Sequence, residues 1–237
     1  MMDTNHIVPY TSFDSREWHM IILAITDIHG HISEVDSISK EIAAADIVIL
    51  TGDLTHFGGE QDIKAVIDPI RQLNPHILAI PGNCDHHEVD AYLAQEGMSI
   101  QRRSAVIDGI GFVGVGGSLP CPLATPIELS EDDFEAHLQE AASGLPVGMP
   151  MILVVHQPPY HTINDFANIR MHVGSRAIRR FVVEHNPIAC FTGHIHEGIG
   201  IDTVGQTKVI NPGPLWQGHY TYAKISDHIE ELEIRDF

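Results

Sequence analysis

Two histidines separated by a single residue, His194 and His196, follow an apolar run that ends at Thr192. In an extended backbone residues i and i+2 face the same way, so both imidazoles should project to one side, several ångströms apart. Imidazole is the commonest metal-ligating side chain, and this separation suits two metal ions better than one. The spacing therefore predicts a site for two metal ions at the end of a strand.

Four further polar clusters each follow an apolar run that is typical of a buried strand. They are Asp27 with His29 after residues 21–26, Asp53 after 47–51, Asn83 with Cys84 and Asp85 after 77–81, and His156 after 151–155. Ligands of open α/β sheets bind beyond the carboxyl ends of the strands. We therefore expect five strand ends to deliver carboxylates, imidazoles and an amide to one place.

Strands and helices alternate in the first hundred residues. Apolar runs over 21–26, 46–51 and 76–81 predict strands, and helical spacing of apolar residues over 32–42 and 63–73 predicts the helices between them. Ser33 is the expected N-cap of the first helix, and Pro69 is expected to kink or break the second. A further helix is expected near residues 88–96.

Antiparallel pairing is expected from residue 106 onward. Asp108-Gly109 lies between two apolar runs and is a strong hairpin signal, and Ser130 should cap a helix that runs to Ala142. Two more strand and helix units and several short C-terminal strands follow. The pattern predicts an α/β fold of two mixed sheets with helices outside them.

The length and composition indicate one domain. The chain has 237 residues, of which 43% are hydrophobic, and this is enough for one sizeable core. We expect a single domain over residues 20–237, preceded by an N-terminal extension over 1–19 that shows neither strand nor helix periodicity. No stretch reaches the roughly 18 apolar residues of a membrane span, and the opening residues do not resemble a signal peptide.

The charge of the chain restricts its partners. It has 13 Lys and Arg against 32 Asp and Glu, a formal net charge of −19, which repels nucleic acids and anionic membranes. Small phosphate esters remain suitable partners, and neither nucleic acid nor membrane is expected. Cys84, Cys121 and Cys190 are few and far apart, which argues against a disulfide framework and a cysteine zinc site. The expected location is the cytoplasm.

Taken in order, the motifs D-x-H, G-D, G-N-x-D, H and G-H-x-H resemble the motif series of the calcineurin-like metallophosphoesterases, over about residues 20–225. Further stretches at 156–159, 172–175 and 211–213 resemble the small prokaryotic phosphoesterases of that superfamily. The resemblance implies a four-layer α-β-β-α sandwich, with the two sheets packed face to face, and hydrolysis of a phosphoester.

The resemblance also implies seven ligands for two metal ions. Asp27, His29 and His196 would hold the first ion, Asn83, His156 and His194 the second, and Asp53 would bridge them. Imidazole and carboxylate ligands suit manganese, the first choice here, and also iron, zinc or nickel. Two such ions can clamp a phosphoryl group and lower the pKa of a bridging water. The expected activity is hydrolysis of small phosphate esters through a bridging hydroxide, with diesters favoured over monoesters.

The residue after Asn83 departs from the family pattern, because many members have a histidine there and this chain has Cys84. Cys84 and His86 are the candidate catalytic residues for protonating the leaving group, with Asp85 or a metal-bound water as alternatives. His172 is a candidate for substrate binding. The loops expected to recognise the substrate are 119–126, 160–172 and 215–219.

Each motif also has an ordinary structural explanation. Asp27 could cap a helix, Asp53 and Asn83 could be turn residues, and His156 could be a satisfied core histidine. The alternatives for the whole chain are a non-catalytic binding or scaffold module, a phosphomonoesterase and a nuclease. The seven filled ligand positions disfavour the scaffold. The negative charge and the lack of a Lys/Arg stripe disfavour the nuclease.

Overall fold

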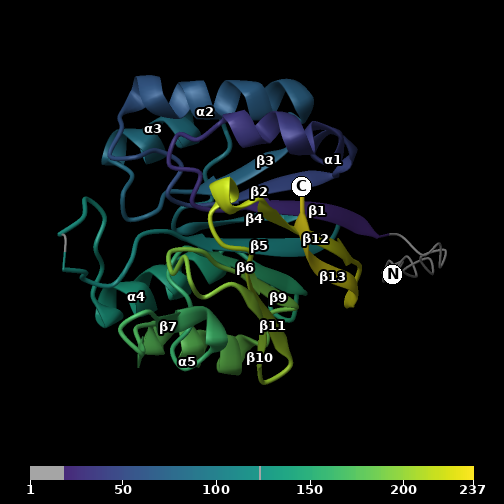
Figure 1. The fold of residues 1–237 in the computed structure, drawn as a ribbon. Coiled ribbons are helices and arrows are strands. Elements are labelled where there is room, and N and C mark those ends of the chain that lie inside the picture. Colours follow the sequence, from purple (N-terminus) through teal and green to yellow (C-terminus); the bar gives the residue numbers. More distant parts are fainter. Residues whose placement is uncertain (1–18, 123) are drawn as a thin grey trace, which may run out of the picture.

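Two β-sheets lie face to face at the centre of the molecule, and helices cover the outer face of each (Figure 1). The computed structural model of the chain describes residues 19–122 and 124–237. The predicted extension over 1–19 lies outside these residues, except for His19. The layers run helix, sheet, sheet, helix, which confirms the predicted fold class.

Five strands form the first sheet. In their order across the sheet they are β13 (Ile229–Asp236), β12 (His219–Ile225), β1 (Met20–Ile25), β2 (Ile47–Thr51) and β3 (Ile77–Ile80). β1, β2 and β3 are parallel, and β12 and β13 extend the sheet with antiparallel pairing. The three parallel strands are almost wholly buried, since both faces of the sheet are covered, and this explains their continuous apolar sequences.

Six strands form the second sheet. In order they are β10 (Gly200–Val204), β11 (Thr207–Asn211), β9 (Ala189–Phe191), β6 (Met151–Val155), β5 (Ile110–Val115) and β4 (Arg103–Ile107). The middle four strands are parallel, and the two edge strands pair antiparallel. A separate small hairpin consists of β7 (Phe166–Ala167) and β8 (Met171–His172).

The helices fall into two groups. Those against the first sheet are the 3-10 helix η1 (Ser33–Ile38), α1 (Ser39–Ala44), α2 (Glu60–Leu73) and α3 (His87–Gln95), and those against the second are α4 (Glu131–Ala142) and α5 (Arg176–His185) (Figure 1). Two short 3-10 helices, η2 (Ile163–Asp165) and η3 (Leu215–Gln217), lie in loops.

Three apolar clusters fill the spaces between the layers. Alternate residues of a strand face opposite sides of the sheet, so Leu23 and Ile25 of β1 pack against the helices while Ile22 and Ala24 pack between the sheets. A third cluster, which includes Phe134, lies between the second sheet and α4 and α5. Because the core is packed from both sides, the strand ends are fixed relative to one another.

Two local predictions are confirmed. Asp108 and Gly109 both have positive φ, 47° and 83°, as a two-residue hairpin turn between β4 and β5 requires. Ser130 caps α4, because its hydroxyl accepts a hydrogen bond from the backbone N–H of Asp133 at 3.1 Å.

One other prediction is wrong, and the break considered at Pro69 does not occur. The predicted helix over 32–42 is divided into η1 and α1, and Ser33 donates its hydroxyl to Glu34 instead of capping. Serine and aspartate side chains compete for the backbone groups of a helix, and this segment contains Ser33, Asp36, Ser37 and Ser39. Pro69 lies inside an unbroken α2, because buried residues on both sides of it, such as Val66 and Ile70, hold the helix against the sheet.

Among the described helices, none is both long and apolar enough to cross a membrane.

Candidate metal centre

The predicted ligands lie in loops that leave neighbouring strands at one end of the two sheets. The loops are joined by backbone hydrogen bonds, including Asp27 N–H to the carbonyl of Gly52 at 3.0 Å and Gly193 N–H to the carbonyl of His156 at 3.1 Å. The loop after β9 also touches the end of β1, because a Cβ added to Gly193 would overlap Thr26. Glycine at this position therefore lets the two sheets meet at the centre.

Four of the predicted ligands have a left-handed backbone conformation. Their φ angles are 51° for Asp27, 47° for His29, 50° for Asp53 and 68° for His194. Positive φ is uncommon for residues other than glycine and costs free energy, and it concentrates at functional sites. The backbone turns sharply at each of these residues, immediately after the strands.

The first group of ligands surrounds Oδ1 of Asp27. This oxygen lies 3.3 Å from Nε2 of His196 and 3.8 Å from Nε2 of His29. The other oxygen, Oδ2, accepts hydrogen bonds from the Thr26 hydroxyl at 2.7 Å and from the backbone N–H of His194 at 3.1 Å. The carboxylate is therefore held with one oxygen facing the two imidazoles.

Asp53 lies between the two groups. Its Oδ2 is 3.6 Å from Nε2 of His29, and its Oδ1 is 3.5 Å from Nε2 of His156. The backbone N–H of Cys84 donates to Oδ1 at 2.8 Å and fixes the carboxylate. A Cβ on Gly82 would overlap this side chain, so glycine is required there. This is the placement that a bridging carboxylate needs.

The second group is centred on His156, which is fully buried. Its Nε2 lies 3.0 Å from Oδ1 of Asn83, and its ring centroid is 5.2 Å from that of His194. Its Nδ1 lies 2.8 Å from the carbonyl oxygen of Thr51. Because a carbonyl only accepts, Nδ1 carries a proton, and in the neutral ring Nε2 then offers its lone pair to the centre.

The charges of these groups depend strongly on one another. Burial would raise the pKa of Asp53, but the neighbouring His156 outweighs it and holds that pKa well below its usual value. Burial would lower the pKa of His156, yet Asp53 raises it to about 9. Burial lowers the pKa of His194 to about 4, helped by the charge of His156. His194 is therefore neutral at pH 7, while His156 holds a proton when no other cation is present.

The side chains fit metal ions. Both ring nitrogens of His29 are buried and have no hydrogen-bond partner among residues 19–122 and 124–237, which is costly unless something binds them. The lone pair on Nε2 of neutral His156 faces Oδ1 of Asn83 and Oδ1 of Asp53. These three atoms are all acceptors, so only a cation between them satisfies all three. Ligand atoms of Asp27, His29 and His196, and separately of Asp27, Asp53 and His156, lie within 4.8 Å of one another. Such nitrogen and oxygen ligands suit divalent transition metals.

The backbone at His194 and His196 is not extended, contrary to the expectation from their spacing. His194 has φ 68° and the segment forms a turn, so its ring goes to His156 while that of His196 goes to Asp27. The buried Asn211 holds this turn by donating to the carbonyls of Gly193 and Ile195, at 3.4 and 2.8 Å. The two histidines still lie in separate ligand groups, but a turn separates them instead of an extended backbone.

The candidate proton donors are placed differently. The thiol of Cys84 lies within 4.8 Å of ligand atoms of His29 and Asp53, and burial, with the charge of Asp53, raises its pKa well above the ordinary value. His86 is exposed and precedes α3.

Asp85 is fully buried and accepts four hydrogen bonds, from Gly82, Leu54 and both the backbone and hydroxyl of Thr55. Asp85 thus joins the loops after β2 and β3 and has no oxygen left for the reaction.

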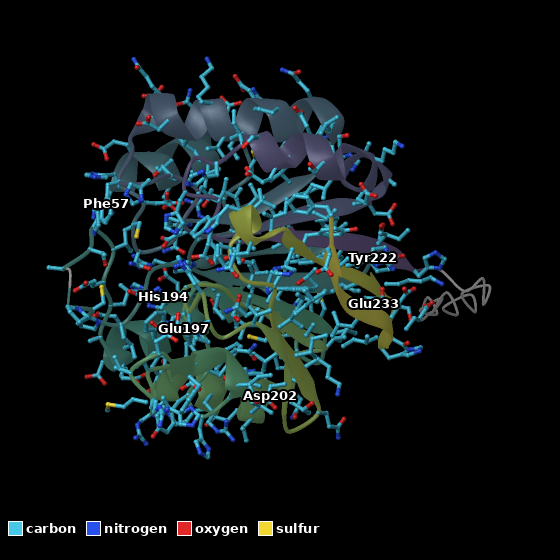
Figure 2. All side chains as sticks on the ribbon, in the orientation of Figure 1. Phe57, His194, Glu197, Asp202, Tyr222 and Glu233 are labelled. Carbon is cyan, nitrogen blue, oxygen red and sulfur yellow. The ribbon has the colours of Figure 1, made fainter. Side chains whose placement is uncertain are left out.

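His172 faces a hollow beside the centre. Its Nδ1 lies 2.6 Å from the buried carboxylate of Asp165, and it lines a hollow of about 510 Å³ that includes Glu197 but none of the predicted metal ligands. A separate hollow of about 300 Å³ has His194 in its wall and also includes Glu197. Figure 2 shows His194 and Glu197 left of centre, away from Tyr222 at the right. His172 stays a prediction for substrate binding.

The expected recognition loops are close to the centre. The hollow beside His194 is walled by parts of the first two loops, at 119–122 and 167–169. In the third loop, the Trp216 ring lies 5.3 Å from that of His29. Neither Trp216 nor His56, whose ring is 5.7 Å from that of His29, was singled out from sequence, since neither belongs to a motif. The local sequence carries no signal for these contacts.

The chain is similar to known proteins. A family model of calcineurin-like phosphoesterases matches residues 20–198. The uncharacterized protein MJ1162 of Methanocaldococcus jannaschii is 37% identical over 202 residues, which are 83% of this chain and 89% of that protein.

Solved structures share the fold. TT1561 of Thermus thermophilus matches with a TM-score of 0.74 at 21% identity, covering 92% of this chain and 98% of that one. An archaeal phosphodiesterase matches with a TM-score of 0.52 at 16% identity, covering 92% of this chain and all (100%) of the other.

Asp85→Asn should destabilise the protein by about 3 kcal/mol, because an amide NH₂ would replace an oxygen that accepts buried hydrogen bonds. Urea unfolding of the metal-free protein measures this. The matched control is Asp90→Asn, because Asp90 accepts a hydrogen bond from the Ser99 hydroxyl. This variant should leave the urea midpoint nearly unchanged. Equal midpoints for the two variants would contradict the structural role of Asp85.

Affinity for Mn²⁺ should rise with pH, by up to about tenfold per unit between about pH 6.5 and 8.5, because His156 must release a proton to bind metal. The raised pKa of His156 also stabilises the metal-free protein below pH 6.5, and this contribution is lost as pH rises through about 9. Calorimetric titration in the absence of air measures the affinity. An affinity independent of pH over this range would contradict the arrangement around His156.

Proposed function

Because the chain belongs to the calcineurin-like phosphoesterase family, we propose that it hydrolyses small phosphate diesters with the help of two divalent transition-metal ions. The observation that carries this proposal is the position of Asp53. Its two carboxylate oxygens face imidazoles of different groups, at 3.6 and 3.5 Å. A single carboxylate with two such partners is what a pair of ions requires.

Each of the two ligand groups would hold one ion. Asp27, His29 and His196 would hold one ion, and Asn83, His156 and His194 the other, with Asp53 shared. Manganese is the proposed metal, with iron, zinc or nickel as alternatives. When bound, such a pair activates a water molecule and neutralises the charge on a phosphoryl group.

The chain's own residues prepare the centre for this chemistry. Thr26 and the backbone of His194 orient Asp27, Cys84 N–H orients Asp53, and the carbonyl of Thr51 sets the tautomer of His156. Asp27, Asp53 and His156 therefore have their directions fixed before the metal arrives. Preorganisation of this kind limits the reorganisation needed during the reaction.

The charge around the centre favours diesters over monoesters. Among the described residues that line the hollow beside His194 and those of the two ligand groups, none is Lys or Arg. A monoester carries up to two negative charges, and a diester carries one, so the diester needs less positive charge from the protein. The apolar wall of this hollow, with Leu119, Pro122 and Val173, suits an uncharged ester group.

The proton for the leaving group has two candidate donors in the chain. Cys84 lies at the centre, but the raised pKa of its thiol makes it a hydrogen-bond donor and a weak acid. His86 is exposed at the start of α3. Leaving groups of low pKa need little help, so water is sufficient for these.

The charge and the cysteines of the chain bear on its partners and location. The net charge of −19 disfavours a nuclease, and the filled ligand positions disfavour a scaffold without activity. Cys84, Cys121 and Cys190 are all free thiols, which is consistent with the cytoplasm. A small phosphate ester is the proposed partner, with neither nucleic acid nor membrane.

Asp53→Asn should lower kcat on bis(p-nitrophenyl) phosphate with Mn²⁺ by about 10³-fold or more, since the amide removes the charge shared by both ions. His172→Ala is the comparison, and it should mainly raise KM. The wild-type protein should prefer this diester to p-nitrophenyl phosphate in kcat/KM. Equal losses of kcat in the two variants would contradict the role of Asp53, and turnover that needs no metal would contradict the proposed function.

A further inference from the structure

Trp216 lies against the first ligand group of the centre. Its ring centroid is 5.3 Å from that of His29, 5.1 Å from that of His196 and 5.4 Å from that of His31. The interplanar angles are 56°, 81° and 51°. None of these imidazoles stacks flat on the indole, and 38% of Trp216 stays exposed.

The backbone fixes Trp216 next to the metal ligands. The preceding Leu215 is fully buried, and its N–H donates to the carbonyl of Thr26, directly before Asp27, at 3.2 Å. Gly218 closes the turn of η3 with φ 89°. The backbone next to the indole is therefore bonded to the strand end that carries Asp27 and His29.

An exposed indole in this place can bind another planar ring. Single exposed apolar residues are common on protein surfaces and need no explanation. Trp216 differs because it touches two predicted metal ligands, so a phosphoryl group bound at the centre would bring its ester substituents within reach of the indole. Stacking of a base on an aromatic side chain stabilises binding by about 1–3 kcal/mol.

The centre has two flanks with different chemistry. On the side of His194 lies the apolar hollow of about 300 Å³, and on the side of His29 and His196 lies Trp216. A phosphodiester has two substituents on phosphorus, one for each flank. A phosphomonoester would leave one flank empty.

We propose that Trp216 stacks on the nucleobase of a nucleoside phosphoester, which makes nucleoside phosphodiesters the substrate class of this centre. This inference rests on the proposed function, because it needs the phosphoryl group at the metal ligands. Trp216 acts as a specificity determinant that contacts the substrate away from the reacting phosphorus.

The test compares adenosine 5′-monophosphate with ribose 5-phosphate, which has a hydroxyl in place of the base, by calorimetric titration into the Mn²⁺-loaded protein. The adenosine nucleotide should bind about 5- to 150-fold more tightly. In Trp216→Leu the two affinities should become similar, and Trp216→Phe should keep part of the difference. Phe57→Leu is the matched control, since it removes an exposed aromatic residue that contacts His56, and it should keep the whole difference.

Fluorescence gives a second measurement. The chain has two tryptophans, Trp18 and Trp216, so Trp18→Phe leaves Trp216 as the only indole. Excited at the red edge of its absorption, this indole should be quenched by adenosine 5′-monophosphate and not by ribose 5-phosphate.

The two probes separate the inference from the function on which it rests. Equal affinities for both probes in the wild-type protein, or equal loss of discrimination in Trp216→Leu and Phe57→Leu, would overturn the role of Trp216. Binding of ribose 5-phosphate that persists after chelation of the metal would instead count against the proposed metal-dependent function. If Trp216 only supported His29 and His196, its loss would lower the affinity for both probes equally. This result would also overturn the inference.

Discussion

The carboxylate of Asp53 connects the two halves of the centre. One oxygen faces His29 and the other faces His156, while the N–H of Cys84 prevents rotation. Buried negative charge is stable only with compensating positive charge or hydrogen bonds. The pKa values around it show this dependence, since Asp53 is held ionised and His156 is held protonated until another cation replaces that proton.

This arrangement depends on close contact between the two sheets. Gly193 lets the loop after β9 touch Thr26, Gly82 makes room for Asp53, and the buried Asp85 ties together the loops after β2 and β3. The apolar clusters hold the strands, and the strained turns at their ends direct the ligands inward. The free energy of the large core thus supports several unfavourable backbone conformations at one place.

Sequence reasoning predicted the fold and the strand-end positions because continuous apolar runs and polar residues after them are local signals. It was less successful where tertiary contacts override local preference. Pro69 stays within α2 because flanking residues are buried, and the Ser33 hydroxyl donates to Glu34 instead of capping the helix. The turn at His194 and the contact of Trp216 with His29 depend on distant segments. Residues 215–219 were expected to form a recognition loop, but no local pattern showed that Trp216 reaches the ligands. The ligand assignments themselves remain predictions that the geometry brings together.

The central claim is that Asp53 is shared by two metal ions. It is tested most directly by an anomalous difference map from crystals of the Mn²⁺-loaded protein. The account predicts two peaks about 3.5–4 Å apart, on either side of the Asp53 carboxylate, one beside Asp27, His29 and His196 and the other beside Asn83, His156 and His194. A single peak, or peaks that do not contact Asp53, would contradict it.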